Sequence, residues 1–172
     1  MVTIYLPKDN FYDFVTFAPV KGTGQSITLT DVNFTMIPLH IRGGAVLPLR
    51  TTGAMTTTEL HTKDFEFVVA PDAKGTAAGS LYVDDGVSIV QEKSTSVEMG
   101  FASGKLCING SFAYDVGVKV ASVAFLGVET HPTTVAVHPG KQNVPFSYDS
   151  ASKVLRVQID MPLTDGFEVA FH

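Results

Sequence analysis

The chain has 172 residues, and its 17 acidic and 12 basic side chains give a formal net charge of −5. Hydrophobic residues make up 45% of the chain and charged residues 17%, a composition that excludes a disordered protein. The acidic balance argues against nucleic-acid binding, because phosphate contacts require a basic face. No apolar run reaches the roughly 18 to 20 residues that span a bilayer, so no membrane span is predicted.

The residue types favour β structure. There are 22 valines and 18 threonines, and both are favoured on pleated sheets. Short apolar or alternating runs recur between turn residues, whereas no window carries a helical apolar stripe over three turns. We therefore expect an all-β fold, an antiparallel β-sandwich. The predicted strands, in chain order, are 3–6, 11–17, 26–29, 34–41, 45–49, 65–69, 80–83, 87–91, 97–102, 105–109, 116–126, 133–137, 144–148, 153–159 and 167–171.

The turn residues divide these strands into two units. Asp84-Asp85-Gly86 lies between β-prone flanks and predicts a tight hairpin, and Arg42-Gly43-Gly44 predicts a turn in which glycine allows a positive φ. Residues 51–58 are small, polar and uncharged, as in a connector. We therefore predict a boundary near 51–58, between a smaller β unit of about fifty residues that leans on something else and one complete β-sandwich of about 115 residues.

No arrangement of residues predicts a catalytic, cofactor or metal site. Asp84-Asp85-Gly86 resembles part of a calcium loop but lacks the later ligands, so a turn explains it better. No pair of acids stands out for glycoside hydrolysis, and no Gly-x-Ser-x-Gly elbow is present. The histidines lack the spacing of metal ligands, and rim or surface positions are expected for His40, His61, His131, His138 and His172.

Aromatic residues leave a sugar-binding role open. Phe11, Tyr12, Phe14 and Phe17 form a cluster that we assign mostly to the core, with Tyr12 as the one ring that could be exposed. Exposed rings there, or at Tyr82 and Tyr114, would favour a free-standing carbohydrate-binding or lectin-like module.

Two sequons are candidate N-glycosylation sites. They are Asn33-Phe34-Thr35 and Asn109-Gly110-Ser111, and Asn109-Gly110 also has the composition of a hairpin turn. The start of the chain lacks the basic and apolar regions of a signal peptide.

Three segments are specific in their order and spacing. They are 4–14 (IYLPKDNFYDF), 37–49 (IPLHIRGGAVLPL) and 75–89 (GTAAGSLYVDDGVSI). Together they resemble the C-terminal region of α-glucosidases of glycoside hydrolase family 31. This resemblance implies an incomplete proximal β-sandwich portion at 1–52 and a distal β-sandwich domain at 53–172. Phe11 stands where that family often has tryptophan, and Asn33 stands where a proline is common.

The resemblance implies a function without catalysis. The catalytic nucleophile and acid/base of the family belong to a (β/α)8 barrel that precedes this region, and no residue here matches them. We therefore expect a non-catalytic region, inactive alone, that packs on the barrel and supports it. Exposed sheet edges would recruit that barrel or a second copy of the chain, and an α-glucan oligosaccharide is a further candidate partner. The parent enzyme is expected to be secreted or in the secretory pathway; an active hydrolase with a new site is the weakest hypothesis.

Overall fold

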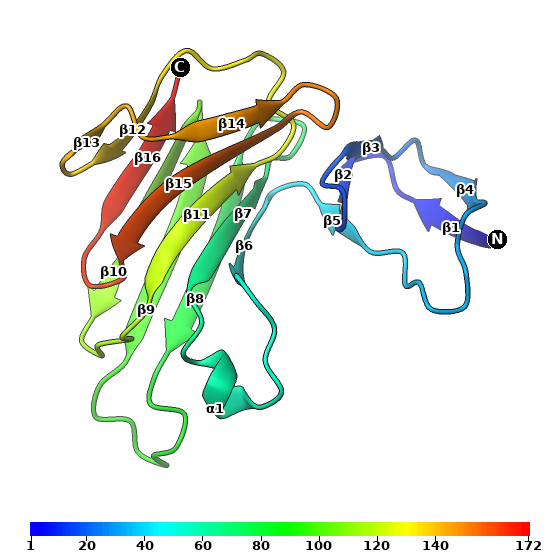
Figure 1. Ribbon diagram of the computed structural model, residues 1–172. Helices are drawn as coiled ribbons and strands as arrows, with labels where there is room; N and C mark the ends of the chain where they lie inside the picture. Colours follow the sequence, from blue (N-terminus) through cyan, green and yellow to red (C-terminus); the bar gives the residue numbers. More distant parts are fainter.

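The fold consists almost entirely of strands. The computed structural model describes residues 1–172, apart from the side chains at 141 and 142. It contains strands β1 to β16 and one four-residue helix, α1 (Thr57–Leu60). A large sandwich lies beside a smaller group of N-terminal strands (Figure 1). The predicted all-β sandwich class is confirmed.

The N-terminal residues form two small sheets. β1 (Val2–Leu6) pairs with β4 (Gln25–Leu29) in an antiparallel two-stranded sheet. β2 (Asn10–Asp13) is the centre of a three-stranded sheet, between β3 (Pro19–Lys21) and β5 (His40–Arg42).

The chain between β4 and β5 is irregular. Residues 30–39 contain neither strand nor helix, so most of the strand predicted at 34–41 is wrong. The Asn33 side chain accepts hydrogen bonds from Thr35 and turns the chain there, and Pro38 has no backbone N–H to donate to a ladder.

The large sheet has eleven strands in the order β13-β12-β16-β10-β9-β8-β6-β7-β11-β15-β14. Most pairs are antiparallel, and two pairs, β6–β8 and β7–β11, are parallel. The strands are β6 (Ala45–Arg50), β7 (Phe65–Ala70), β8 (Ala77–Val83), β9 (Thr95–Ala102), β10 (Lys105–Phe112), β11 (Lys119–Phe125), β12 (Val135–His138), β13 (Lys141–Gln142), β14 (Phe146–Asp149), β15 (Val154–Pro162) and β16 (Phe167–Phe171).

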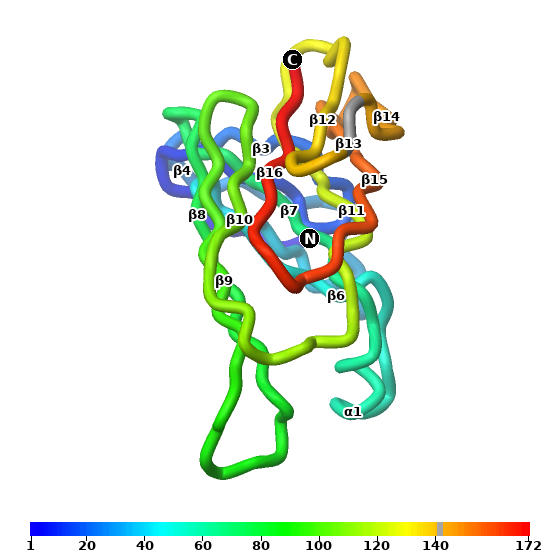
Figure 2. The backbone as a smooth tube through the Cα atoms, turned by 90° about the vertical axis from the view of Figure 1, so that its left-hand side faces the viewer, coloured from blue at the N-terminus to red at the C-terminus, as the bar shows by residue number. Residues whose placement is uncertain are grey.

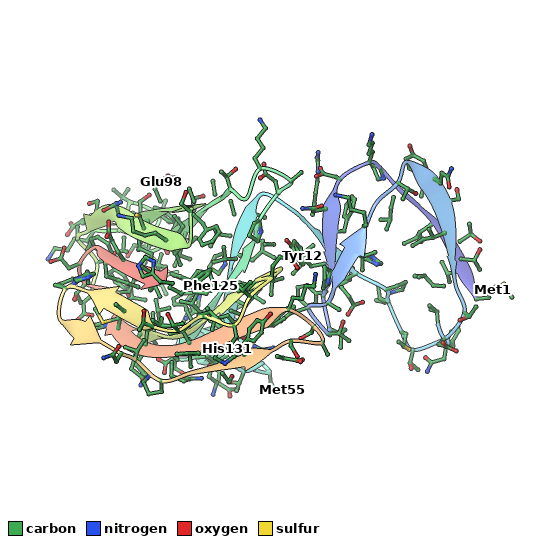
Figure 3. All side chains as sticks on the ribbon, turned by 90° about the horizontal axis from the view of Figure 1, so that it is seen from above. Met1, Tyr12, Met55, Glu98, Phe125 and His131 are labelled. Atoms are coloured by element: carbon green, nitrogen blue, oxygen red, sulfur yellow. The ribbon has the colours of Figure 1, made fainter. Side chains whose placement is uncertain are left out.

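This sheet curls until its two ends approach. Val144, just before β14, donates its backbone N–H to the carbonyl of Val135 in β12 at 3.1 Å. The inward side chains form one core; in β9 buried and exposed residues alternate strictly from Thr95 to Ala102. Phe125 lies between the two layers of the sandwich (Figure 3).

β7 and β11 are buried on both faces, which creates a second core. Phe67 and Phe125 face the sandwich interior, whereas Val68 and Ala124 face the opposite way, toward the three-stranded sheet. This second cluster contains Tyr12, Phe17, Ile41, Val68, Ala70, Ala124, Leu126 and Val154. The N-terminal unit is therefore joined to the sandwich by packed apolar side chains as well as by the chain itself.

Two predicted turns are wrong. Asp84-Asp85-Gly86 begins a long connection, residues 84–94, between β8 and β9, and the strand predicted at 87–91 is absent from this described segment. Asn109 and Gly110 lie inside β10, opposite Glu98 and Val97 of β9, whereas the turn between these strands falls at 103–104. In both cases the Asp, Asn and glycine residues favour a turn locally, but the pairing of the strands decides where the chain turns.

The predicted boundary between a proximal unit at 1–52 and a distal unit at 53–172 stays a prediction. The structure places β6, which precedes that boundary, in the large sheet between β7 and β8.

Candidate functional site

The Arg42-Gly43-Gly44 turn connects the N-terminal unit to the sandwich. A Cβ on Gly43 would lie 2.7 Å from the carbonyl oxygen of Pro71, and Gly44 has a φ of +98°, so both positions favour glycine. Arg42 pairs with Asp9 through Nε and Oδ2 at 2.9 Å, and this bond lowers the pKa of the Asp9 carboxyl. The motif thus holds the β2, β5 and β7 ends together.

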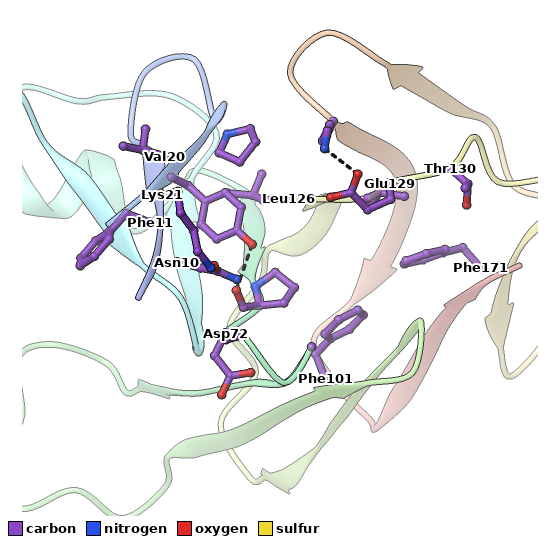
Figure 4. A pocket seen from close by; sticks show the side chains of 18 residues that line it. Asn10, Phe11, Val20, Lys21, Asp72, Phe101, Leu126, Glu129, Thr130 and Phe171 are labelled. Atoms are coloured by element: carbon purple, nitrogen blue, oxygen red, sulfur yellow. Dashed lines mark hydrogen bonds and ion pairs between the residues drawn. The ribbon is translucent and has the colours of Figure 1, made fainter. Parts of the chain in front are cut away.

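Beside this turn lies an open groove of about 750 Å³ between the two units (Figure 4). Its walls come from β2 and β3, from the connection after β7, and from the connection after β11. The lining residues are Asn10, Phe11, Tyr12, Pro19, Val20, Lys21, Pro71, Asp72, Ala73, Gly75, Phe101, Leu126, Gly127, Val128, Glu129, Thr130, Lys153 and Phe171.

Tyr12 links the two units at the base of the groove (Figure 3). Its side chain is only 4% exposed, and its hydroxyl donates to the carbonyl of Pro71 at 2.9 Å. Burial raises the pKa of Tyr12 to about 12, with smaller contributions from the Asp72 and Glu129 carboxylates. The expectation that Tyr12 could be exposed is wrong, because its ring fills the second core.

The charged groups of the groove are already paired with protein groups. Lys153 Nζ lies 2.5 Å from Glu129 Oε2, and Lys21 Nζ donates to Asn10 Oδ1 at 2.6 Å. The pKa of Asp72 is lowered, mainly by the hydrogen bond that its carboxylate accepts from the backbone N–H of Thr76. Desolvation acts in the opposite direction but is outweighed. Such a groove can position groups, and the lowered pKa keeps Asp72 ionised as a hydrogen-bond acceptor.

The Asp84-Asp85-Gly86 segment forms a self-contained loop start. Asp84 accepts from the Gly86 N–H at 2.8 Å, and Asp85 accepts from the Ser88 hydroxyl and from the backbone of Val87 and Ser88. These bonds, led by the Ser88 hydroxyl, strongly lower the pKa of Asp85. The carboxylates are thus occupied in shaping the loop.

Lowered carboxyl pKa values recur at seven positions of the fold. A glycosidase of the two-carboxylate type needs one acid whose pKa is raised, so that it stays protonated to act. The carboxyl pKa values that this fold shifts are lowered, at Asp9, Asp13, Glu59, Asp72, Asp85, Asp149 and Glu168.

The histidines are dispersed over the fold. His131 packs on the rings of Phe146 and Tyr148, and His61 lies against Gly86, where a Cβ would be 2.8 Å from its ring. Among the described side chains no three His, Cys, Asp or Glu residues gather as metal ligands. No helix in the described part of the chain combines the length and apolarity needed to cross a membrane.

Exposed apolar side chains are concentrated in two places. The first is the segment 34–39, where Phe34 is fully exposed and Ile37 is 79% exposed, together with Met36 and Leu39. The second is the end of the sandwich where α1 and the 84–94 loop project together (Figure 2), with Met55, Tyr82, Val87, Ile89 and Val90. We call the first of these the apolar segment.

The two sequons have different surroundings. Asn33 is exposed in the irregular chain 30–39, and its Oδ1 accepts from the N–H and the hydroxyl of Thr35, both at 2.9 Å. Asn109 lies within the β9–β10 ladder.

Neither the groove nor the apolar segment was predicted from the sequence. The groove is lined by residues far apart in the sequence, so no local pattern indicates it. The apolar run around Pro38 is visible in the sequence, but its residues favour the strand predicted at 34–41.

These features define a class of protein: an all-β chain in which a large sandwich packs against a smaller N-terminal β unit and exposed apolar side chains gather in one segment of that unit. Comparison with known proteins agrees with this class. The family model described as the glycosyl hydrolase family 31 C-terminal domain matches residues 1–47. The chain is homologous to the C-terminal region of family 31 glycoside hydrolases.

Similar curated proteins are fungal glucosidases. The chain is 39% identical over 168 residues to the probable alpha/beta-glucosidase agdC of Neosartorya fischeri, covering 98% of this chain and 18% of that protein. It is 36% identical over 146 residues to glucoamylase 1 of Candida albicans, covering 84% of this chain and 15% of that protein. The chain thus spans about a fifth or less of the length of these relatives.

Solved structures share the fold over the whole chain. The glucosidase II alpha subunit superposes with a TM-score of 0.80 at 22% identity, over 99% of this chain and 21% of that one. An alpha-1,4-glucan lyase of Gracilariopsis lemaneiformis superposes with a TM-score of 0.72 at 20% identity, over 99% of this chain and 20% of that one. The fold of this chain therefore recurs as a part of two larger chains.

Proposed function

We propose that this chain is a non-catalytic region of an α-glucosidase-type glycoside hydrolase, which packs on the catalytic domain and has no activity alone. The homologous regions of the relatives lie within much longer chains, which supports a role as part of a larger enzyme.

The apolar segment is the observation that carries the proposal. Four large apolar side chains, Phe34, Met36, Ile37 and Leu39, are exposed within six residues and have no regular structure around them. Burying a side chain such as Phe34 or Ile37 contributes roughly 1.5–3 kcal/mol each, so their exposure is costly unless a partner covers them. The catalytic domain of the parent enzyme is the partner that the family relationship supplies.

A chimeric enzyme tests this role. The C-terminal region of the probable alpha/beta-glucosidase of Aspergillus fumigatus, which is 39% identical over 168 residues, is replaced by this chain. We expect the chimera to hydrolyse p-nitrophenyl α-glucoside, whereas the purified chain does not. Ile37→Ser is expected to lower the melting temperature and soluble yield of the chimera without lowering the melting temperature of the isolated chain.

Val15→Ser is the matched control, because Val15 is also β-branched and also 79% exposed but lies outside the apolar segment. Equal effects of Ile37→Ser and Val15→Ser on the chimera would contradict docking through the segment. Turnover by the isolated chain that an active-site glucosidase inhibitor abolishes would contradict the non-catalytic role.

The alternative, a free-standing carbohydrate-binding module, has weaker support. It depends on exposed rings, and Tyr12 is buried with its hydroxyl bonded to Pro71. Tyr82 is exposed, but it lies at the opposite end of β8 from the groove. Calorimetry with maltose, isomaltose and starch would detect a binding site for α-glucan oligosaccharides if one exists.

A further inference from the structure

We propose that Asn33 is an N-glycan acceptor on the folded chain and that Asn109, despite its sequon, is not. This inference does not rest on the proposed function, because it concerns only the two sequons and their surroundings. The chemistry required is transfer of an oligosaccharide from a lipid diphosphate donor by an oligosaccharyltransferase.

The transfer step makes one demand on the protein. Asn33 Nδ2 forms a bond to the anomeric carbon of the donor sugar, and the bond from that carbon to the diphosphate oxygen breaks. The lipid diphosphate leaves with the electron pair, and the amide proton passes to a base of the transferase. No electron is exchanged, so the sequon has to reach the transferase with its amide nitrogen and hydroxyl accessible and with a backbone that can bend into the enzyme.

Asn33 meets this demand in the folded state. It is exposed, and its hydrogen bonds from Thr35 both end on Oδ1, so neither of them occupies Nδ2. Residues 30–38 belong to no strand, so this stretch can bend into an enzyme groove without breaking a sheet.

Asn109 does not meet it: residues 109–111 are exposed, but their backbone is held in strand β10. β10 pairs with β9 at every position from Lys105 to Phe112, so the sequon lies in the middle of a continuous ladder. The preceding residue, Ile108, is fully buried in the sandwich core. Residues 109–111 pair with β9, whereas β16 pairs only with residues 105–108, so lifting the sequon into a transferase breaks the β9–β10 ladder. Paired strands open with higher free energies than loops do.

The position of Asn33 is compatible with docking of the apolar segment. Asn33 precedes that segment, so a glycan attached there would lie at its margin rather than on Met36, Ile37 or Leu39. The hydroxyl of Thr35 is part of the acceptor, which makes it the second residue that a test can change.

The test uses the folded chain purified from a host that does not glycosylate, with a eukaryotic oligosaccharyltransferase and a dolichol-diphosphate oligosaccharide. Glycopeptide mass spectrometry measures the occupancy of each sequon. We expect occupancy at Asn33 to exceed that at Asn109 by at least about tenfold, in line with the difference between loop and core-strand opening. Asn33→Gln and Thr35→Ala should abolish the modification, and Asn109→Gln should leave it unchanged.

A synthetic peptide of residues 105–115 shows whether the Asn109 sequon is itself a substrate. We expect the peptide to be modified, because only the fold withholds Asn109. Three results would overturn the proposal: an unmodified Asn33, comparable occupancy of the two sequons in the folded chain, or an unmodified peptide. Circular dichroism of each variant confirms that the comparison is between folded chains.

Discussion

Replacing Tyr12 with Phe removes one hydroxyl at the junction of the two units and leaves the ring in place. That hydroxyl donates to the Pro71 carbonyl at 2.9 Å, from a residue that is 4% exposed. A hydrogen bond contributes about 0.5–1.5 kcal/mol net, and a carbonyl left without a partner adds up to about 1–3 kcal/mol if water cannot replace the donor. Because the groove is open on one side, we expect a loss of about 1–2 kcal/mol.

The same substitution changes how stability depends on pH. The pKa of Tyr12 is raised to about 12, so the unfolded chain releases this proton at lower pH than the folded chain does. The stabilisation from the protonated hydroxyl is therefore fully present below about pH 10 and is lost as the pH rises toward 12. Tyr12→Phe should remove this alkaline loss, since phenylalanine does not ionise.

The assay is thermal and guanidinium unfolding of the purified chain at pH 7 and between pH 9 and 11. A loss of about 1.5 kcal/mol corresponds to a melting temperature lower by roughly 3–6 °C for a chain of this size. Tyr82→Phe is the control, because Tyr82 is 57% exposed. If Tyr12→Phe unfolded like the wild type at pH 7 and kept the same alkaline loss, Tyr12 would not join the two units as described.

Three further substitutions test other parts of the fold. Gly127→Ala should lower the free energy of unfolding by about 2–4 kcal/mol, because Gly127 has a φ of +67° and an added Cβ would lie 2.8 Å from the Tyr12 hydroxyl. The control Gly117→Ala has the same φ but open space around it, and should lower this free energy by only about 1 kcal/mol. Equal losses in chemical unfolding would contradict the contact with Tyr12. Leu106→Ala should cost about 2–5 kcal/mol, since Leu106 is fully buried, and a denaturation midpoint unchanged from wild type would contradict its place in the core. The pKa of Asp85 is lowered, so the hydrogen bonds that its carboxylate accepts in the loop are present above about pH 4 and weaken as the pH falls. Asp85→Asn should speed amide exchange at Val87 and Ser88 at neutral pH, because their N–H groups donate to Asp85. Unchanged exchange at these two residues would contradict that role.

The strands that could be predicted are those in which residue alternation and burial agree. β9 alternates along its full length and β15 alternates from Arg156 to Asp160, so period 2 alone is enough to place them. β7 reads as a short continuous apolar run, and its burial on two faces explains why. In these strands the sequence pattern and the three-dimensional environment carry the same information.

Other features depend on contacts between distant residues and have no local signal. Tyr12 is an aromatic residue of the kind that can stack on a sugar. Only its contact with Pro71, 59 residues away, shows that its hydroxyl joins the two units. Asn109-Gly110 has the composition of a hairpin turn, yet the register of β10 against β9 places it in a strand. Side-chain type limits what a residue can do, whereas strand pairing decides which of those options is realised.

The distribution of apolar surface explains why this region would depend on a larger enzyme. Residues 1–39 carry eight of the thirteen large apolar side chains that are exposed, and residues 91–172 carry none within the described side chains. The β1–β4 sheet has only two strands, and such a sheet is marginally stable in water without further packing. The sandwich therefore buries its large apolar side chains within itself. The N-terminal unit is stabilised on one side by the second core, and its apolar segment stays uncovered. A partner that covers this segment would stabilise the least stable part of the fold, which is why loss of docking should appear first as a loss of stability in the assembled enzyme.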